Sequence, residues 1–241
     1  MIEVLPVEGL PEIAEGDDLA ALIGAAVELR DGDVVCVAQK VVSKSEGRVV
    51  RLDEVEPSAE ARRLAGHDGD PRRLEIVLRE SARIVRSRPP LVIAETRHGF
   101  VCASAGVDAS NAPAPDTVVL LPEDPDASAA RLRAALEELT GCSLGVIVTD
   151  TFGRSWRLGI TNVAIGASGI EVLRDLRGVY DPTGYELHST VIAIADEIAA
   201  AAELVMGKTA RIPAAVVRGV DAGGSGTGSE LVMPAAYDLF R

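Results

Sequence analysis

Residues 144–154, LGVIVTDTFGR, hold the part of the sequence that indicates the fold most clearly. A buried strand is predicted over residues 144–149, because a short apolar run bounded by turn-forming and polar residues is typical of one. The run ends on Asp150, and Thr151 follows it. Open sheets tend to bind ligands at the carboxyl ends of their strands, so an acid and a hydroxyl at this position indicate a candidate site.

Two arginines follow this acid at close spacing. Gly153 permits a tight backbone path. Arg154 comes directly after it, and Arg157 follows three positions later. A carboxylate that holds a cation, next to guanidinium groups that bind oxygen atoms, suits a phosphate chelated by a metal ion. The alternative is that Asp150 or Thr151 caps the N-terminus of a helix and that the arginines lie on the surface.

The rest of the chain mixes strand-like and helix-like segments without a regular order. Apolar runs predict further strands at residues 2–7, 34–38, 91–95, 99–103, 118–121 and 214–218. Helical apolar spacing predicts helices at residues 19–29, 58–65, 74–85, 128–140 and 187–206. The irregular order and the hairpin-like pair at residues 91–103 favour an α+β fold over an α/β fold. No internal repeat or linker divides the sequence.

Composition excludes several classes of function. The formal net charge is −13, which disfavours a nucleic-acid partner because it repels the phosphate backbone. No apolar run reaches the length of about 18 residues that spans a bilayer, so we expect no membrane partner and a cytoplasmic location. The three cysteines lie far apart in apolar runs, and we expect buried free thiols rather than a zinc site.

A second candidate site lies in residues 103–111, ASAGVDASN. A predicted strand leads into small residues, and Asp108, Ser110 and Asn111 then follow within four positions. Asp108 could hold a hard cation while Asn111 hydrogen-bonds a ligand. The alternative is an ordinary turn, because Asp, Ser and Asn are common turn residues.

The lysines indicate a third candidate, because only three of the 24 basic residues are lysines. Lys40 and Lys44 fall in residues 39–47, QKVVSKSEG, after the strand predicted at 34–38. A lysine is a compact point charge suited to phosphate, although a surface turn with flanking charges explains the segment equally well.

Two glycine-containing segments are candidates for ligand-binding loops. Residues 202–209, AELVMGKT, fit a permissive phosphate-loop pattern, but they close a predicted helix instead of opening one, so Gly207 is better explained as a helix cap. Residues 219–228 contain five glycines and are predicted to be flexible, with folding over a ligand as the alternative.

Taken in order, short motifs along the whole chain resemble those of the coenzyme F420-0:L-glutamate ligase family. The motifs are Val7–Pro11, Val42–Arg48, His98–Ala103, Ala105–Asn111, Asp150–Arg154, Val163–Gly166, Leu204–Gly207 and Val217–Gly219. The resemblance implies a family-specific α+β fold with a mixed sheet, acting as an intertwined homodimer. It also implies that residues 1–241 form one γ-glutamyl ligase unit, with two interleaved subdomains as the alternative.

The resemblance further implies a site. Asp108 and Asp150 would hold one divalent metal ion, Mg or Mn, and Thr151 would contribute to a second. GTP would be bound by Leu10, Pro11, Glu12, Ile13, Gln39, Lys44, Asn111, Met206, Gly207 and Lys208. A monovalent cation is a further expected cofactor. Family members often have glutamine after Met-Gly, where this sequence has Lys208, and an ammonium there would repel the second metal ion or bind a phosphate directly.

The implied reaction adds L-glutamate to F420-0 through γ-linkages. The carboxylate of F420-0 would take the γ-phosphoryl group of GTP, with charge stabilised by metal ions, Lys44 and the catalytic candidates Arg154 and Arg157. The glutamate amine would then attack the acyl-phosphate. Two alternatives stay open: a related ligase with another acid acceptor, and a non-catalytic nucleotide-binding regulator.

Overall fold

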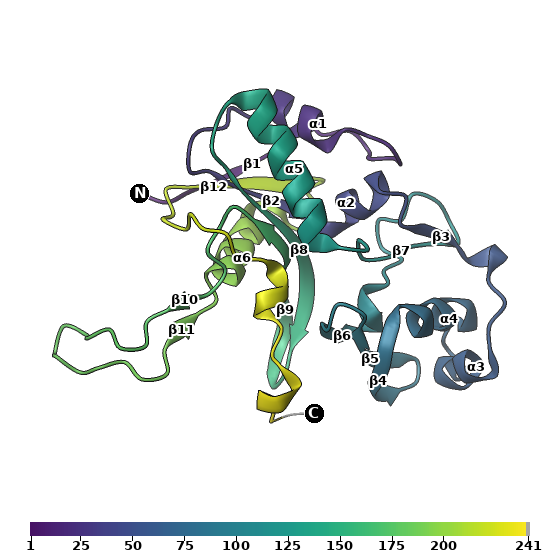
Figure 1. Ribbon diagram of the computed structural model, residues 1–241. Helices are drawn as coiled ribbons and strands as arrows, with labels where there is room; N and C mark the ends of the chain where they lie inside the picture. The colour runs from purple at the N-terminus through teal and green to yellow at the C-terminus, as the bar shows by residue number, and fades with distance from the viewer. Residues whose placement is uncertain (240–241) are drawn as a thin grey trace.

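The computed structural model describes residues 1–239 and is built around a five-stranded mixed sheet (Figure 1). Its strand order is β1 (Glu3–Pro6), β12 (Ala214–Arg218), β2 (Val34–Ala38), β8 (Gly145–Arg154) and β9 (Arg157–Ser168). Only β2 and β8 pair in parallel, and the other neighbours are antiparallel. The predicted mixed sheet and α+β class are confirmed.

Helices cover both faces of this sheet. Val35 and Val37 of β2 pack with residues of α1 (Leu19–Ala26) and α5 (Pro125–Thr140). Val34 and Cys36 face the opposite way and pack with α6 (Ile194–Met206). Because successive side chains of a strand point to opposite faces, a strand covered on both sides is a continuous apolar run, as residues 34–37 are.

Residues 46–121 add a second apolar cluster to the right of the sheet in Figure 1. Its elements are α3 (Ala59–Ala65), α4 (Pro71–Glu80), the pair β3 (Val49–Arg51) and β7 (Thr117–Val119), and a sheet of β4 (Ser81–Arg88), β5 (Leu91–Thr96) and β6 (Val101–Ala103). The short 3₁₀ helices η1 (Leu52–Glu54) and η2 (Ser104–Gly106) belong to the same part. This cluster carries the loop that contains Asp108 to the edge of the main sheet.

The remaining elements flank the main sheet. The helix α2 (Gln39–Ser45) follows β2, and the small ribbon of β10 (Arg174–Asp175) and β11 (Val191–Ile192) projects to the left in Figure 1. The last helical elements of the described residues are η3 (Gly228–Leu231), which contacts β9, and η4 (Ala235–Tyr237). None of the helices in residues 1–239 combines the length and the apolar character needed to cross a bilayer.

Several sequence predictions are confirmed closely. The strands predicted at 34–38 and 214–218 have those bounds. Gly141 ends α5 in the left-handed conformation, with φ 72°. Gly207 ends α6, with its N–H bonded to the Glu203 carbonyl, so the interpretation of residues 202–209 as a helix end is confirmed. The three cysteines are free thiols, of which Cys36 and Cys102 are buried as predicted and Cys142 is half-buried.

Other predictions are wrong in informative ways. No helix starts at Asp150 or Thr151, because β8 continues to Arg154 and turns back as β9 in a long hairpin. The helix predicted at 74–85 ends at Glu80, and the next residues pair with β5 instead. The helix predicted at 187–206 begins only at Ile194, after the ribbon β10–β11. In each case pairing with the preceding or following strand outweighs the local pattern.

Residues 39–47 and 219–228 also differ from the expected turn and flexible loop. Residues 39–45 form α2, which buries Gln39, Ser43 and Lys44. In the glycine-rich segment, a Cβ on Gly228 would lie 2.7 Å from the Gly166 Cα, and one on Gly224 would lie 2.6 Å from the Glu171 nitrogen. These glycines therefore allow the segment to pack directly on the backbone of residues 165–172.

Candidate active site

The two strongest motifs meet at one edge of the main sheet. β2 and β8 run in parallel and their pairing ends with Ala38 opposite Thr149, so α2 begins, and Asp150 lies, directly beyond the paired part of the two strands. Ligands bind at this edge of open sheets because the backbone and the loops after the strands leave polar groups available there. The sheet topology thus places the predicted lysine segment beside the predicted acid.

Asp108 reaches the same edge from the second cluster of the fold. The residue forms an isolated bridge with Val119, and its carboxylate accepts a bond of 2.7 Å from the Ser110 backbone nitrogen. Lys40 Nζ lies 2.6 Å from Asp108 Oδ2 and 2.6 Å from Ser110 Oγ. Burial raises the pKa of Asp108, but these bonds, first of all the one from Lys40, hold it below its usual value.

Lys40 lies in the lysine segment that the sequence indicates, but the resemblance assigns it no role. Its side chain is 16% exposed, and it joins α2 to the Asp108 loop. The scarcity of lysine was the available signal, because the charges of Lys40 and Lys208 both act on Asp150 and Lys44 lies on the same helix as Lys40. The preference for Lys44 over Lys40 rested on the resemblance alone.

Asp150 lies within electrostatic range of Asp108 and of two lysines. Burial, and to a smaller extent the negative charge of Asp108, raise the pKa of Asp150 to about 6. The Thr151 backbone and the charges of Lys208 and Lys40 oppose this shift. Cys102 of β6 also has a raised pKa, about 12, because of burial and the nearby Asp150 charge. The two acids therefore lie close enough for their charges to interact, and a shared cation stays a prediction.

Thr151 points to the other face of the sheet, because it follows Asp150 directly on the strand. Its hydroxyl donates to Asn162 Oδ1 at 2.7 Å, and Lys208 Nζ hydrogen-bonds the same hydroxyl oxygen. Lys208 comes from the segment after α6, so the helix end with Met206 and Gly207 is adjacent to Thr151. An ammonium therefore stands beside the hydroxyl that the resemblance assigned to a second metal ion.

Lys44 is buried on α2 and contacts the N-terminal segment. Its side chain is 6% exposed, and Nζ lies 2.5 Å from Glu12 Oε1, whose own side chain is 79% exposed. This contact brings the predicted segment 10–13 to Lys44. Within that segment, Ile13 is buried in the core and Pro11 is exposed.

Gln39 adds an unpaired donor at the start of α2. The residue is 1% exposed, and its Oε1 accepts a bond of 2.9 Å from Ser43. Its Nε2 has no hydrogen-bond partner among residues 1–239. Buried donors are rarely left unpaired, so this amide group is available to a ligand oxygen.

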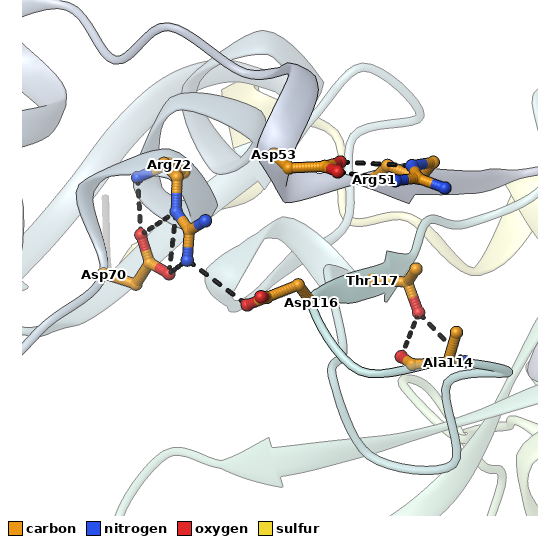
Figure 2. A network of polar contacts seen from close by, with 7 residues as sticks. All are labelled: Arg51, Asp53, Asp70, Arg72, Ala114, Asp116 and Thr117. Carbon is orange, nitrogen blue, oxygen red and sulfur yellow. Dashed lines mark hydrogen bonds and ion pairs between the residues drawn. The ribbon is translucent and has the colours of Figure 1, made fainter.

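The loop that carries Asn111 is held at its far end by the network in Figure 2. Arg72 pairs with Asp70 at 2.7 Å and with Asp116 at 3.3 Å, which ties the loop to the start of α4. Thr117 closes the loop further by donating to the Ala114 carbonyl at 2.6 Å. Asn111 itself is exposed and has φ 55°, a conformation that asparagine tolerates better than most residues.

The predicted catalytic arginines lie apart from the acids. Arg154 and Arg157 face each other at the exposed tip of the β8–β9 hairpin, and Arg154 Nη2 donates to the Leu158 carbonyl at 3.1 Å. At about 3.3 Å per residue, Arg154 lies roughly 13 Å along the strand from Asp150. The structure does not bring these arginines to Asp108 and Asp150 within one chain.

The residues present fit one divalent cation better than two. No group of three His, Cys, Asp or Glu side chains within residues 1–239 could hold a metal ion alone. Mg²⁺ is commonly bound by only one or two carboxylates together with substrate phosphates, which Asp108 and Asp150 can provide. Thr151 does not fit a second divalent ion, because its hydroxyl is engaged by the ammonium of Lys208.

Comparisons with known proteins identify relatives along the whole chain. A family model described as F420-0:Gamma-glutamyl ligase matches residues 9–219. The Coenzyme F420:L-glutamate ligase of Methanopyrus kandleri is 52% identical over 91% of this chain and 86% of its own length. The protein of the same name from Archaeoglobus fulgidus is 46% identical over 100% of this chain and 96% of its own. The chain belongs to the F420-0:γ-glutamyl ligase family.

Proposed function

We propose that this protein is a GTP- and divalent-metal-dependent ligase that joins L-glutamate to F420-0 in γ-linkage. The observation that carries the proposal is the ion pair of Asp108 with Lys40, together with Asp150, whose carboxylate interacts with the charges of Lys208 and Lys40, directly beyond the paired part of β2 and β8. Two acids can hold a divalent cation, and nearby ammonium groups can bind the phosphates of a nucleoside triphosphate that carries this cation. Relatives that span the whole chain are named as glutamate ligases of coenzyme F420.

The proposed chemistry starts from a carboxylate, which is a poor electrophile. The carboxylate oxygen of F420-0 takes the γ-phosphoryl group of GTP, GDP leaves, and an acyl-phosphate forms. A divalent cation held by Asp108 and Asp150 would supply charge neutralisation at the phosphates. Lys44, released from Glu12, binds the phosphate chain, and the Gln39 amide donates to an oxygen of the nucleotide. The amine of glutamate then attacks the acyl carbon, loses a proton and expels phosphate.

Nucleotide release tests this function. Sustained GDP release is expected only when F420-0 and glutamate are both present, because the acyl-phosphate formed with the first GDP is consumed only when the glutamate amine attacks it. GDP release that needs glutamate but not F420-0 indicates another acid acceptor. Nucleotide binding with no release under any of these conditions indicates a regulator and overturns the proposal.

Lys208 is proposed to take over part of the charge of a second metal ion. Its ammonium already lies at the Thr151 hydroxyl and within electrostatic range of Asp150. A fixed positive charge there stabilises the phosphates that a second cation would otherwise neutralise.

Replacing this lysine should therefore change the metal requirement. Lys208→Gln is expected to bind more Mn²⁺ per chain than the wild type in the presence of a non-hydrolysable GTP analogue, measured by equilibrium dialysis. Its activity should also need more added metal. Arg211→Gln removes an exposed positive charge from the same segment and serves as the control, with wild-type metal binding. A Lys208→Gln metal titration that overlays the wild type contradicts the assignment.

A homodimer is proposed as the working form. Leu158 is 99% exposed and Ile160 is 61% exposed on the β8–β9 hairpin, which projects below the rest of the sheet in Figure 1. Neighbouring exposed apolar side chains on a long hairpin are typical of a surface that another chain covers. The exposed arginines of the tip would then act near a second copy. Light scattering at several protein concentrations measures the oligomeric state, and a monomer throughout contradicts the proposal.

A further inference from the structure

A groove of about 640 Å³ runs along the β8–β9 hairpin. The hairpin forms one wall, the β4–β6 sheet forms another, and the segment around η3 and η4 completes it. Its lining includes Arg86, Phe100, Phe152, Trp156, Val163 and Val232. Small-molecule sites have volumes of about 300–1,000 Å³ and mostly apolar walls with a few polar groups, so the groove is of the right kind and size.

One end of this groove is formed by neighbours of Asp150 on β8 and β9. Phe152 is two residues beyond Asp150, so both side chains project from the same face of β8. Val163 is the cross-strand partner of Asp150 in β9 and lines the groove as well. A molecule in the groove can therefore place one end at the proposed phosphoryl-transfer site.

Aromatic side chains are concentrated here although the chain has few of them. Only seven Phe, Trp and Tyr residues occur in the sequence, and three of them, Phe100, Phe152 and Trp156, line this groove. The Phe100 and Phe152 rings pack edge to face, with centroids 6.1 Å apart. Trp156 is 80% exposed at the hairpin tip. Because exposed indole rings stack well on flat ligands, this arrangement favours a planar aromatic occupant.

We infer that this groove is the acceptor subsite, which binds the planar deazaflavin ring of F420-0 against Trp156 while its carboxylate lies near Asp150. The inference rests on the proposed function. The length of the strand suits this placement. β8 extends roughly 13 Å from Asp150 to Arg154. The ring and the carboxylate of F420-0 are likewise separated, by a flexible chain that contains a phosphodiester. The exposed Arg86 on the groove wall supplies a positive charge for the phosphodiester.

The competing occupant is the hairpin of a second copy. Occupation of the whole groove by another chain would cover the side of β8 that carries Asp150 and Phe152, so the acid acceptor could not reach the phosphates from this direction. The groove is therefore assigned to the small molecule, and the apolar side chains at 158 and 160 to the proposed contact between copies.

Steady-state kinetics of the full chain separate these possibilities. Trp156→Ala is expected to raise the KM for F420-0 on the order of tenfold, as for the loss of one stacking contact, and to leave the KM for GTP unchanged. Trp156→Phe should recover most of this loss. Leu158→Ala is the matched control, because Leu158 is an exposed apolar residue of the same tip that does not line the groove.

Each outcome has a definite meaning. An unchanged KM for F420-0 in Trp156→Ala overturns the subsite while leaving the proposed function intact. Equal losses in Trp156→Ala and Leu158→Ala, together with a shift toward monomer in light scattering, also overturn it and assign the groove to a second copy. A wild-type enzyme that releases no GDP with F420-0 and glutamate refutes the proposed function instead. Titration of F420-0 into each variant without GTP measures its dissociation constant directly. The variants should follow the same order as in the KM for F420-0, with the weakest binding in Trp156→Ala.

Discussion

Asp150→Asn is expected to lower kcat/KM on the order of a thousandfold, because it removes one of the two carboxylates proposed to hold the cation at the transferring phosphoryl group. Asp108→Asn should have a similar effect. The substitutions conserve side-chain volume, so circular dichroism and thermal unfolding should remain close to those of the wild type. Metal-dependent GTP binding, measured with and without Mg²⁺, should lose most of its metal dependence in both variants.

The control for these two acids lies in the same loop as Asp108. Asp116→Asn removes a carboxylate that pairs with Arg72 and is 66% exposed, so both stability and turnover should change little. Wild-type turnover by Asp108→Asn or Asp150→Asn would remove that acid from the proposed site. A loss of the same size in Asp116→Asn would show that the kinetics report on loop position rather than on metal binding.

Lys44→Ala is expected to raise the KM for GTP by about 10- to 100-fold, the loss expected for one charge-assisted hydrogen bond to phosphate. The KM for glutamate should stay near its wild-type value, because Lys44 is proposed to contact only the nucleotide. The side chain of Lys44 is almost fully buried, whereas its partner Glu12 is mostly exposed. The carboxylate can therefore move into solvent when a phosphate replaces it.

Two companion variants make the Lys44 result interpretable. Lys44→Met keeps the buried aliphatic stem, so it should show the same rise in the KM for GTP without a packing defect. Glu12→Gln removes the carboxylate that competes for the ammonium, and its KM for GTP should be equal to or below that of the wild type. Parallel rises in the KM for GTP and for glutamate would contradict a direct phosphate contact and indicate a general structural role.

The parts of the fold that the sequence predicted well are those controlled by local signals. Residues 34–38 and 214–218 are apolar runs bounded by polar or turn residues, and both strands have the predicted bounds. Gly141 and Gly207 end helices because their backbones need a conformation that glycine adopts readily. These features depend on a few neighbouring residues, so they can be predicted from one sequence.

The local sequence pattern does not predict the β8–β9 hairpin, because the hairpin is stabilised by pairing between its two strands and not by the preferences of single residues. Its outer half, from Gly153 to Ile160, is exposed and contains glycines and arginines, which locally favour a loop. The same limit applies to Lys40. Its role depends on Asp108, which is brought close by a loop 68 positions further along the chain, and spacing alone carries no such information.

The most direct test of the account is the mass of the product formed by purified protein from F420-0, GTP and L-glutamate with Mg²⁺ or Mn²⁺. The account predicts F420-0 enlarged by glutamyl residues, with fragmentation that shows γ-linkage, and GDP and phosphate formed in equal amounts with each new amide bond. Unmodified F420-0 at the end of an incubation in which the nucleotide binds would contradict it.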